Sequence, residues 1–363
     1  MLKDMLMRWF SRPTIDRATN VSATLPFALA TDIGANREEN QDRVGAIRVY
    51  PHSRTIDPFV VVAVSDGMGG MRDGAACAAS SLAVFFASMA ASEISDPARR
   101  IEVAANQANS AVFDMYRGTG GATLSAICVT FTGKTVLVNI GDSRVYAGGG
   151  KDLPPVQRLT IDDSLEEAVG GHGRELLQFV GMGDGLKAHV STVSPNIQRL
   201  LITSDGVHFI SHDALCDVFW KAPDIYRAAE RLSAIARWCG SPDNASLAVV
   251  DLKRLRDDFG GATQANFCVW DPFSSLEMLP STNSLQPQQL RRQPVRESKH
   301  AEVTEGGSSG QTKDDVEPKK TRKRRTRKEV SQEKTSAEGP QLVIQIDGDQ
   351  DSTASEKSSE TSK

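Results

Sequence analysis

Apolar runs alternate with short turns that contain glycine and aspartate over roughly the first 253 residues. The β-branched run at residues 59–64 ends at Ser65, Asp66 and Gly67, which is the pattern of a buried strand that meets a turn. Further strands are predicted at residues 123–131, 135–140, 199–203 and 245–251. Apolar spacing typical of helices occurs at residues 74–89, 99–116 and 224–238. Strand clusters separated by paired helices predict a layered α+β domain.

The composition changes near residue 255, and few large apolar residues remain from residue 281 onward, which is typical of a disordered tail. Between the two parts, an aromatic patch either docks on the folded domain or waits for a partner; it consists of Phe267, Val269, Trp270 and Phe273. The first ten residues fit either a short amphipathic helix or a frayed end. The predicted organisation is an N-terminal extension at 1–24, a folded domain at 25–253, an aromatic-containing linker at 254–280 and a disordered polar tail at 281–363.

The predicted tail carries a basic run at residues 319–328, in which eight of the ten residues are Lys or Arg. Such a run can bind nucleic acid or anionic lipid, dock an acidic protein, or remain a solvated tail. No aromatic residue interleaves the run, so base stacking has no support. We therefore rank a solvated tail or protein docking above nucleic-acid binding.

The overall composition indicates a cytoplasmic protein without a membrane span. The formal net charge of the 363 residues is -4, which does not indicate a nucleic-acid binder. The five cysteines form no C-x-x-C pair, and an unpatterned set of thiols fits a reducing compartment. The N-terminus lacks the apolar core of a signal peptide, and no stretch approaches the roughly 20 apolar residues of a membrane span.

Four acidic turns place an aspartate beside a small residue at the edge of an apolar strand: Asp66, Asp142, Asp205 and Asp243. Asp-Gly is common in ordinary turns, so one such dipeptide alone indicates a turn more often than a ligand. Several carboxylates that converge would repel one another, and a hard divalent cation is the usual resolution. The series therefore predicts a magnesium or manganese site, and the lack of a neighbouring His/Cys cluster disfavours zinc.

The order of these motifs resembles the bacterial PPM-type (type 2C) serine/threonine protein phosphatases. The segment from Asp32 to Asp42 is similar to the opening motif of that family, and residues 66–70 are similar to its second motif. Further matching motifs follow in family order at 121–123, 141–146, 159–164, 204–206 and 243–244. The resemblance covers roughly residues 25–252. It implies a four-layer α-β-β-α sandwich of two antiparallel sheets flanked by helix pairs.

The resemblance also implies a cluster of two divalent metal ions, manganese or magnesium. Asp66 would bridge both ions, the Gly67 carbonyl would bind the first, and Asp205 and Asp243 would bind the second. Two such ions lower the pKa of a bridging water, and the resulting hydroxide would attack phosphorus in line without a phosphoenzyme. Asp142 would either bind a third metal ion or pair with Arg144 to fix its turn.

Two further residues receive roles from the resemblance. Asp42 would support the metal-bound waters, and Arg37 would bind phosphate through its planar guanidinium. The alternative for Arg37 is a surface salt bridge with Glu38 or Glu39. Its spacing to Asp42 favours phosphate binding.

The chain departs from the family at two places. The flap at residues 166–184 is short and glycine-rich, which would change substrate choice and weaken a third-metal site. Met68 stands where many eukaryotic relatives have a histidine that is proposed as general acid. His172 and His208 are possible replacements, although we interpret each as structural or solvent-exposed.

The leading hypothesis is an enzyme that hydrolyses phosphoserine and phosphothreonine in phosphoproteins, the products of a serine/threonine kinase. One alternative is a catalytically weak, phosphatase-like regulatory protein that recognises phosphorylated partners without turnover. The intact Asp66, Asp205 and Asp243 set argues against this alternative, and the altered flap keeps it open. A third hypothesis makes the tail the main functional element, which would tether the domain to nucleic acid or to a complex.

Overall fold

All strand pairings in the part of the chain that the structure describes are antiparallel, and they build two separate sheets. The structure is a computed structural model, which describes residues 1–279 apart from residues 52, 69, 70, 72, 150–154, 171, 172, 174, 258 and 260–265. The predicted disordered tail at 281–363 and its basic run at 319–328 lie outside the described residues.

The first sheet has six strands in the spatial order β1-β2-β11-β10-β7-β8. Their bounds are β1 (Arg17–Val21), β2 (Phe27–Asp32), β11 (Ala245–Asp251), β10 (Arg199–Thr203), β7 (Arg144–Gly148) and β8 (Val156–Arg158). The second sheet has seven strands in the order β13-β12-β3-β4-β5-β6-β9. Their bounds are β13 (Ser275–Met278), β12 (Phe267–Trp270), β3 (Arg43–Val49), β4 (Phe59–Ser65), β5 (Leu124–Thr130), β6 (Thr135–Ile140) and β9 (His189–Thr192).

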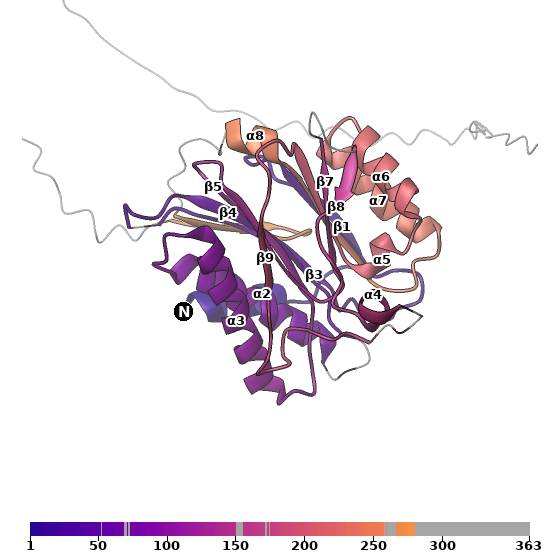
Figure 1. Cartoon of the computed structure of the whole chain (residues 1–363), viewed down its shortest axis with the longest axis horizontal. Helices are drawn as coiled ribbons and strands as arrows, with labels where there is room; N and C mark the ends of the chain where they lie inside the picture. The colour runs from indigo at the N-terminus through magenta and orange to yellow at the C-terminus, as the bar shows by residue number, and fades with distance from the viewer. Residues whose placement is uncertain are drawn as a thin grey trace, which may run out of the picture. The chain divides into compact units, whose positions relative to one another are not determined.

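Helices cover the outer face of each sheet (Figure 1). The helix bounds are α1 (Leu2–Phe10), α2 (Gly74–Ala91), α3 (Pro97–Tyr116), α4 (Leu165–Val169), α5 (Asp205–His208), α6 (His212–Lys221), α7 (Ile225–Trp238) and α8 (Leu252–Asp257). One core lies between the two sheets, a second between the second sheet and α1–α3, and a third between the first sheet and α6–α7. The predicted α+β, four-layer α-β-β-α sandwich is therefore confirmed.

Helix α2 is long and apolar enough to cross a membrane by length and composition, which the sequence analysis did not anticipate. Most of its side chains, including Leu82, Phe85 and Phe86, are buried against the second sheet and the neighbouring helices. A helix that is apolar on nearly all sides is expected where it packs between a sheet and other helices. The packing of α2 inside the domain accounts for its composition.

The folded unit extends beyond the predicted boundaries of 25–253 on both sides. In the predicted N-terminal extension, Leu6 and Phe10 of α1 are buried, and β1 pairs with β2 along its whole length. In the predicted linker at 254–280, β12 pairs with β3, and Trp270 packs edge-on against Phe27 with ring centroids 5.4 Å apart. The aromatic patch is thus part of the sandwich, which agrees with the docked alternative and corrects the linker assignment.

Candidate active site

The predicted site residues of the second sheet lie where β3 begins and β4 ends. Arg43 of β3 pairs with Ser65 of β4, so Asp42 and Asp66 flank this last pair of the ladder. Thr123, which precedes β5, fixes the turn after β4: its hydroxyl accepts a hydrogen bond from the Asp66 amide at 2.9 Å. Its own amide donates to the Asp66 carbonyl at 2.8 Å. The sequence analysis gave Thr123 no role, although it belongs to the matching motif at 121–123.

The first sheet contributes three aspartates to the same edge. Arg144 of β7 pairs with Thr203 of β10, so Asp142, which precedes β7, and Asp205, which follows β10, extend beyond the same end of that ladder. Asp243 lies in the turn before β11, the other neighbour of β10. The structure therefore brings the predicted aspartates of both sheets to one edge of the sandwich.

Mutual repulsion shows how closely these carboxyl groups approach. Burial raises the pKa of Asp66 well above its usual range, and the charges of four other aspartates raise it further: Asp42, Asp205, Asp142 and Asp243. Burial, together with the charges of Asp142 and Asp243, raises the pKa of Asp205 to about 7. Burial, with a smaller contribution from Asp162, raises the pKa of Asp142 to about 6. Carboxyl groups that share one site behave in this way when no cation neutralises them.

A hydrogen bond across the two sheets holds Asp42. The hydroxyl of Ser204, the residue before Asp205, donates to Asp42 Oδ2 at 2.7 Å. Asp42 is only 3% exposed, and its burial raises its pKa to about 7 although the Ser204 bond opposes the shift. Ser204 is a positioning residue that the sequence analysis did not identify, because its contact with Asp42 spans 162 positions of the chain.

Gly67 is required by close packing. A Cβ atom at this position would lie 2.3 Å from the Gly74 carbonyl oxygen at the start of α2, and 2.8 Å from the Gln41 carbonyl oxygen. Gly67 is buried, and it forms a single bridge to Ala122. Only glycine lets the backbone of α2 and of the loop before β3 come this close to the predicted ligand carbonyl.

Arg37 lies at the same edge but does not pair with the residues named in its predicted alternative. Its guanidinium donates to Asp243 Oδ2 at 2.5 Å, rather than to Glu38 or Glu39. Asn244 ties the Arg37 loop to this turn, because its amide donates to the carbonyls of Ile33 and Glu39 at 2.8 and 2.9 Å. Phosphate binding by Arg37 stays a prediction.

The donor set fits a hard divalent cation. As the side chains stand, no three His, Cys, Asp or Glu residues among the described part of the chain are arranged around one point as ligands of an ion. Asp243 is instead paired with Arg37. Asp205 Oδ1, however, is buried without a hydrogen-bond partner. The crowded donors are carboxylate oxygens, which magnesium and manganese prefer, and a cation would offset their repulsion.

Without divalent metal, the stability of the protein is expected to rise as the pH falls from about 8 to about 5. Asp42 and Asp205 each have a pKa of about 7 in the folded chain, against an ordinary value of 3.8. Between these values the unfolded chain releases protons that the folded chain keeps, so a rise in pH favours unfolding. The measurement is the midpoint temperature of thermal unfolding in chelator at the two pH values. Added manganese should reduce the difference between the two midpoints.

The variant that tests this pH dependence is Asp205→Asn, in which the difference in unfolding temperature between the two pH values should be smaller. A midpoint of unfolding that instead falls on acidification in chelator would contradict the crowding of the carboxyl groups.

Comparisons with known proteins agree with this architecture. No protein-family profile matches the chain. The chain is 26% identical over 254 residues to the serine/threonine protein phosphatase PstP of Mycobacterium tuberculosis, and the match covers 64% of this chain. It spans 46% of the length of that curated relative, about half.

Two solved structures have the same fold. The PPM Ser-Thr phosphatase MsPP from Mycobacterium smegmatis, in complex with cacodylate, is 29% identical with a TM-score of 0.52; the match covers 63% of this chain and 99% of MsPP. The catalytic domain of PstP, in complex with two manganese ions, is 25% identical with a TM-score of 0.50; the match covers 65% of this chain and 98% of that domain. The chain is a relative of the bacterial PPM-type phosphatases.

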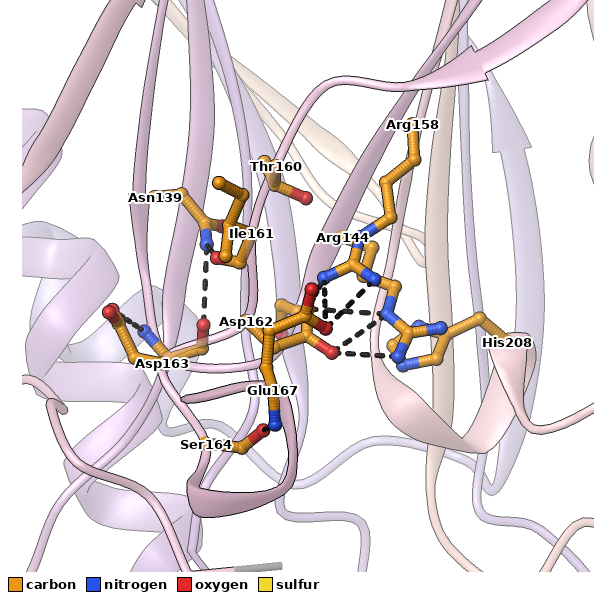
Figure 2. Close-up of polar contacts among 12 residues, drawn as sticks. Asn139, Arg144, Arg158, Thr160, Ile161, Asp162, Asp163, Ser164, Glu167 and His208 are labelled. Carbon is orange, nitrogen blue, oxygen red and sulfur yellow. Dashed lines mark hydrogen bonds and ion pairs between the residues drawn. The ribbon is translucent and has the colours of Figure 1, made fainter. Parts of the chain in front are cut away.

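Within this PPM-type fold, Arg144 has a partner other than the predicted one. It donates to Asp162 through Nε at 3.0 Å and Nη2 at 2.7 Å, and Arg158 reaches the same carboxylate at 2.6 Å. Figure 2 shows dashed lines from the Asp162 carboxylate to both guanidinium groups. The predicted alternative in which Asp142 pairs with Arg144 is therefore wrong, and a third-metal role for Asp142 stays a prediction.

Asp163 fixes the turn that carries Asp142. Its Oδ2 accepts a hydrogen bond from the Gly141 amide at 3.0 Å, and its own amide donates to the Gly141 carbonyl at the same distance. Its Oδ1 accepts from Gln178 at 2.9 Å and lies 2.8 Å from His189 Nε2. Asp163 thus connects the Asp142 turn to the flap.

The short flap is anchored at its C-terminal end. The Asn109 carboxamide of α3 accepts from the Gly181 and Gly183 amides at 2.9 and 3.2 Å, and donates to the Gly183 carbonyl at 2.7 Å. Val180 exchanges two backbone hydrogen bonds with Ala122, at 2.8 and 3.0 Å. Ala122 also forms the bridge to Gly67, so only the backbone of Ala122 separates the flap from the predicted ligand carbonyl.

The sequence analysis names two histidines, His172 and His208, as possible replacements for the general acid, and the structure describes one of them. His208 Nδ1 lies 3.0 Å from the Thr203 hydroxyl, and burial with the charges of Arg144 and Arg158 holds its pKa well below the usual range. A histidine that is neutral near pH 7 is a poor general acid and would not protonate a leaving group. This favours the interpretation of His208 as a structural residue. His172 lies outside the described residues.

Proposed function

We propose that this protein is a metal-dependent phosphatase that hydrolyses phosphoserine and phosphothreonine in proteins. The observation that carries the proposal is the convergence of five aspartates from two sheets at one edge of the sandwich. Burial and like charge raise the pKa values of four of them: Asp42, Asp66, Asp142 and Asp205. An uncompensated cluster of this kind destabilises a fold, so its presence points to a cationic ligand and to function.

The relatives support the same activity. PstP and MsPP are serine/threonine phosphatases, and the PstP catalytic domain holds two manganese ions. In this chain, Asp66, the Gly67 carbonyl, Asp205 and Asp243 would hold two divalent ions, manganese or magnesium. Such ions supply a hydroxide nucleophile near neutral pH by lowering the pKa of bound water.

The chain's own residues would orient the substrate and the reacting water. Asp42 would orient the reacting water, and the Ser204 hydroxyl holds its carboxylate through Oδ2. The Arg37 side chain is 40% exposed, and its planar guanidinium suits two phosphate oxygens. Met68 offers no proton, so solvent would protonate the departing serine or threonine oxygen.

Metal dependence is the decisive test. Protein purified in chelator should leave an aryl phosphate and a phosphothreonine peptide intact, and added manganese or magnesium should restore hydrolysis of both. Zinc and calcium serve as controls for metal selectivity. Hydrolysis that survives complete chelation would refute the proposed mechanism. Calorimetric binding of manganese without turnover of any phosphopeptide would favour a phosphatase-like binding protein instead.

A further inference from the structure

A small cavity adjoins Asp42. Its volume is about 20 Å³, and Trp9, Arg12, Asp42 and Asp271 are among the residues that line it. A cavity needs roughly 10–15 Å³ of such volume to hold one water molecule. The cavity therefore has room for one ordered water.

Three buried polar atoms without a hydrogen-bond partner belong to residues that line this cavity. They are the indole Nε1 of Trp9, Nη2 of Arg12 and Oδ1 of Asp42. Each would cost free energy if it stayed unpaired in the interior. Their grouping around one cavity distinguishes them from the other unpartnered atoms of the described residues, which do not line it.

The chemistry of the three atoms matches one water molecule. Trp9 Nε1–H and Arg12 Nη2–H are donors, and the water oxygen has two lone pairs to accept them. Asp42 Oδ1 is an acceptor, to which the water can donate. Buried waters typically make about three hydrogen bonds of this kind.

The elements around the cavity are fixed independently of any water. Arg12 Nη1 pairs with Asp271 Oδ2 at 2.5 Å, and its guanidinium stacks over the Trp9 ring at 4.0 Å. The other Asp271 oxygen accepts from the amides of Phe273 and Ser274, both at 2.9 Å, in the turn between β12 and β13. These contacts hold the segment after α1 and this turn together beside the cavity.

From this geometry we infer that Trp9 and Arg12 bind an ordered water that in turn binds Asp42 Oδ1. The site makes the N-terminal segment a positioning element of the candidate active site. With Ser204 on Oδ2 and the water on Oδ1, both oxygens of Asp42 are held, and rotation of its carboxylate is restrained. The water site rests on the structure alone, whereas its effect on turnover rests on the proposed function.

The water itself is tested on the unmodified full-length protein. In protein labelled with ¹⁵N-tryptophan, the Trp9 indole proton should show a cross-relaxation peak to a long-lived water, and the resonance is assigned by its loss in Trp9→Phe. A crystal structure that resolves ordered water should place one between Trp9, Arg12 and Asp42. A dry cavity in the crystal, or an indole proton without such a peak, would overturn the inference.

The positioning role is tested by kinetics in saturating manganese. Trp9→Phe keeps a ring and removes the donor, and kcat for an aryl phosphate should fall about tenfold at unchanged KM, which corresponds to the loss of one hydrogen bond to the water that holds Asp42. Arg12→Met should behave similarly, and Arg12→Lys should recover part of the loss. Trp238→Phe, at a position 87% exposed, is the matched control and should retain full activity.

The outcomes separate this inference from the proposed function. If unmodified protein has no phosphatase activity, the proposed function fails, and the water is still decided by spectroscopy and crystallography. If unmodified protein is active and folded Trp9→Phe keeps the parental kcat, the positioning role is refuted.

Discussion

Asp205→Asn is expected to lower kcat for an aryl phosphate by at least about a thousandfold while the protein stays folded, since a predicted metal ligand loses its charge. The variant should also be more stable than the parent in chelator. The reason is that Asp205 contributes to the repulsion that raises the pKa of Asp66, and asparagine removes that charge. The two effects together identify a residue that serves function at the expense of stability.

The measurements for Asp205→Asn are kcat in saturating manganese and the midpoint of thermal unfolding in chelator. Asp213→Asn is the matched control, because Asp213 is an exposed residue in the first turn of α6, outside the cluster. The control should change neither quantity appreciably. Retention of kcat within about threefold by Asp205→Asn would exclude the proposed metal site.

A fragment limited to residues 25–253 is expected to be insoluble or unfolded, whereas a fragment of residues 1–279 should fold. The shorter fragment loses α1 and β1 on one side and β12 and β13 on the other. It thereby exposes the apolar surface that Leu6, Phe10 and Trp270 cover. Each large apolar side chain contributes about 1.5–3 kcal/mol by burial, so these three together contribute about 4.5–9 kcal/mol. This loss is comparable with the roughly 5–15 kcal/mol that stabilises a typical domain.

Urea unfolding followed by circular dichroism compares the two fragments. The longer fragment should give a single cooperative transition and retain aryl-phosphate hydrolysis in manganese. If residues 25–253 alone unfold cooperatively at the same urea concentration as residues 1–279, then α1 and β12 would contribute little to the core, contrary to the structure.

The sequence predicts the central elements of this fold better than its edges. The run that ends at Asp66 is recognisable because its β-branched residues are buried on both faces and an Asp-Gly turn follows. Strand β12 has only four residues, and its burial comes from β3 and from Phe27 far away in the chain. Local periodicity over four residues does not distinguish a sheet strand from a linker with aromatic residues, so the boundary at 253 is placed too early.

In the candidate site, too, the sequence predicts some features and misses others. The aspartates are predicted because each stands in a local motif, whereas their partners depend on tertiary contacts. Arg144 pairs with Asp162 rather than Asp142, and Ser204 holds Asp42 across the two sheets. No local spacing rule selects these pairs. Arg144 meets Asp162 only once β7 and β8 have paired, and Ser204 meets Asp42 only once the two sheets have packed together.

The contact between Arg37 and Asp243 has a consequence for the order of binding under the proposed function. In the structure, the guanidinium acts as an internal counterion for Asp243, one of the proposed metal ligands. A phosphorylated substrate that arrived first would meet an arginine whose charge is already compensated, so it would gain little attraction. Metal bound at Asp243 would free the same guanidinium for the incoming phosphate. A single side chain would thereby make loading of the protein sequential, with the inorganic ligands ahead of the phosphoprotein.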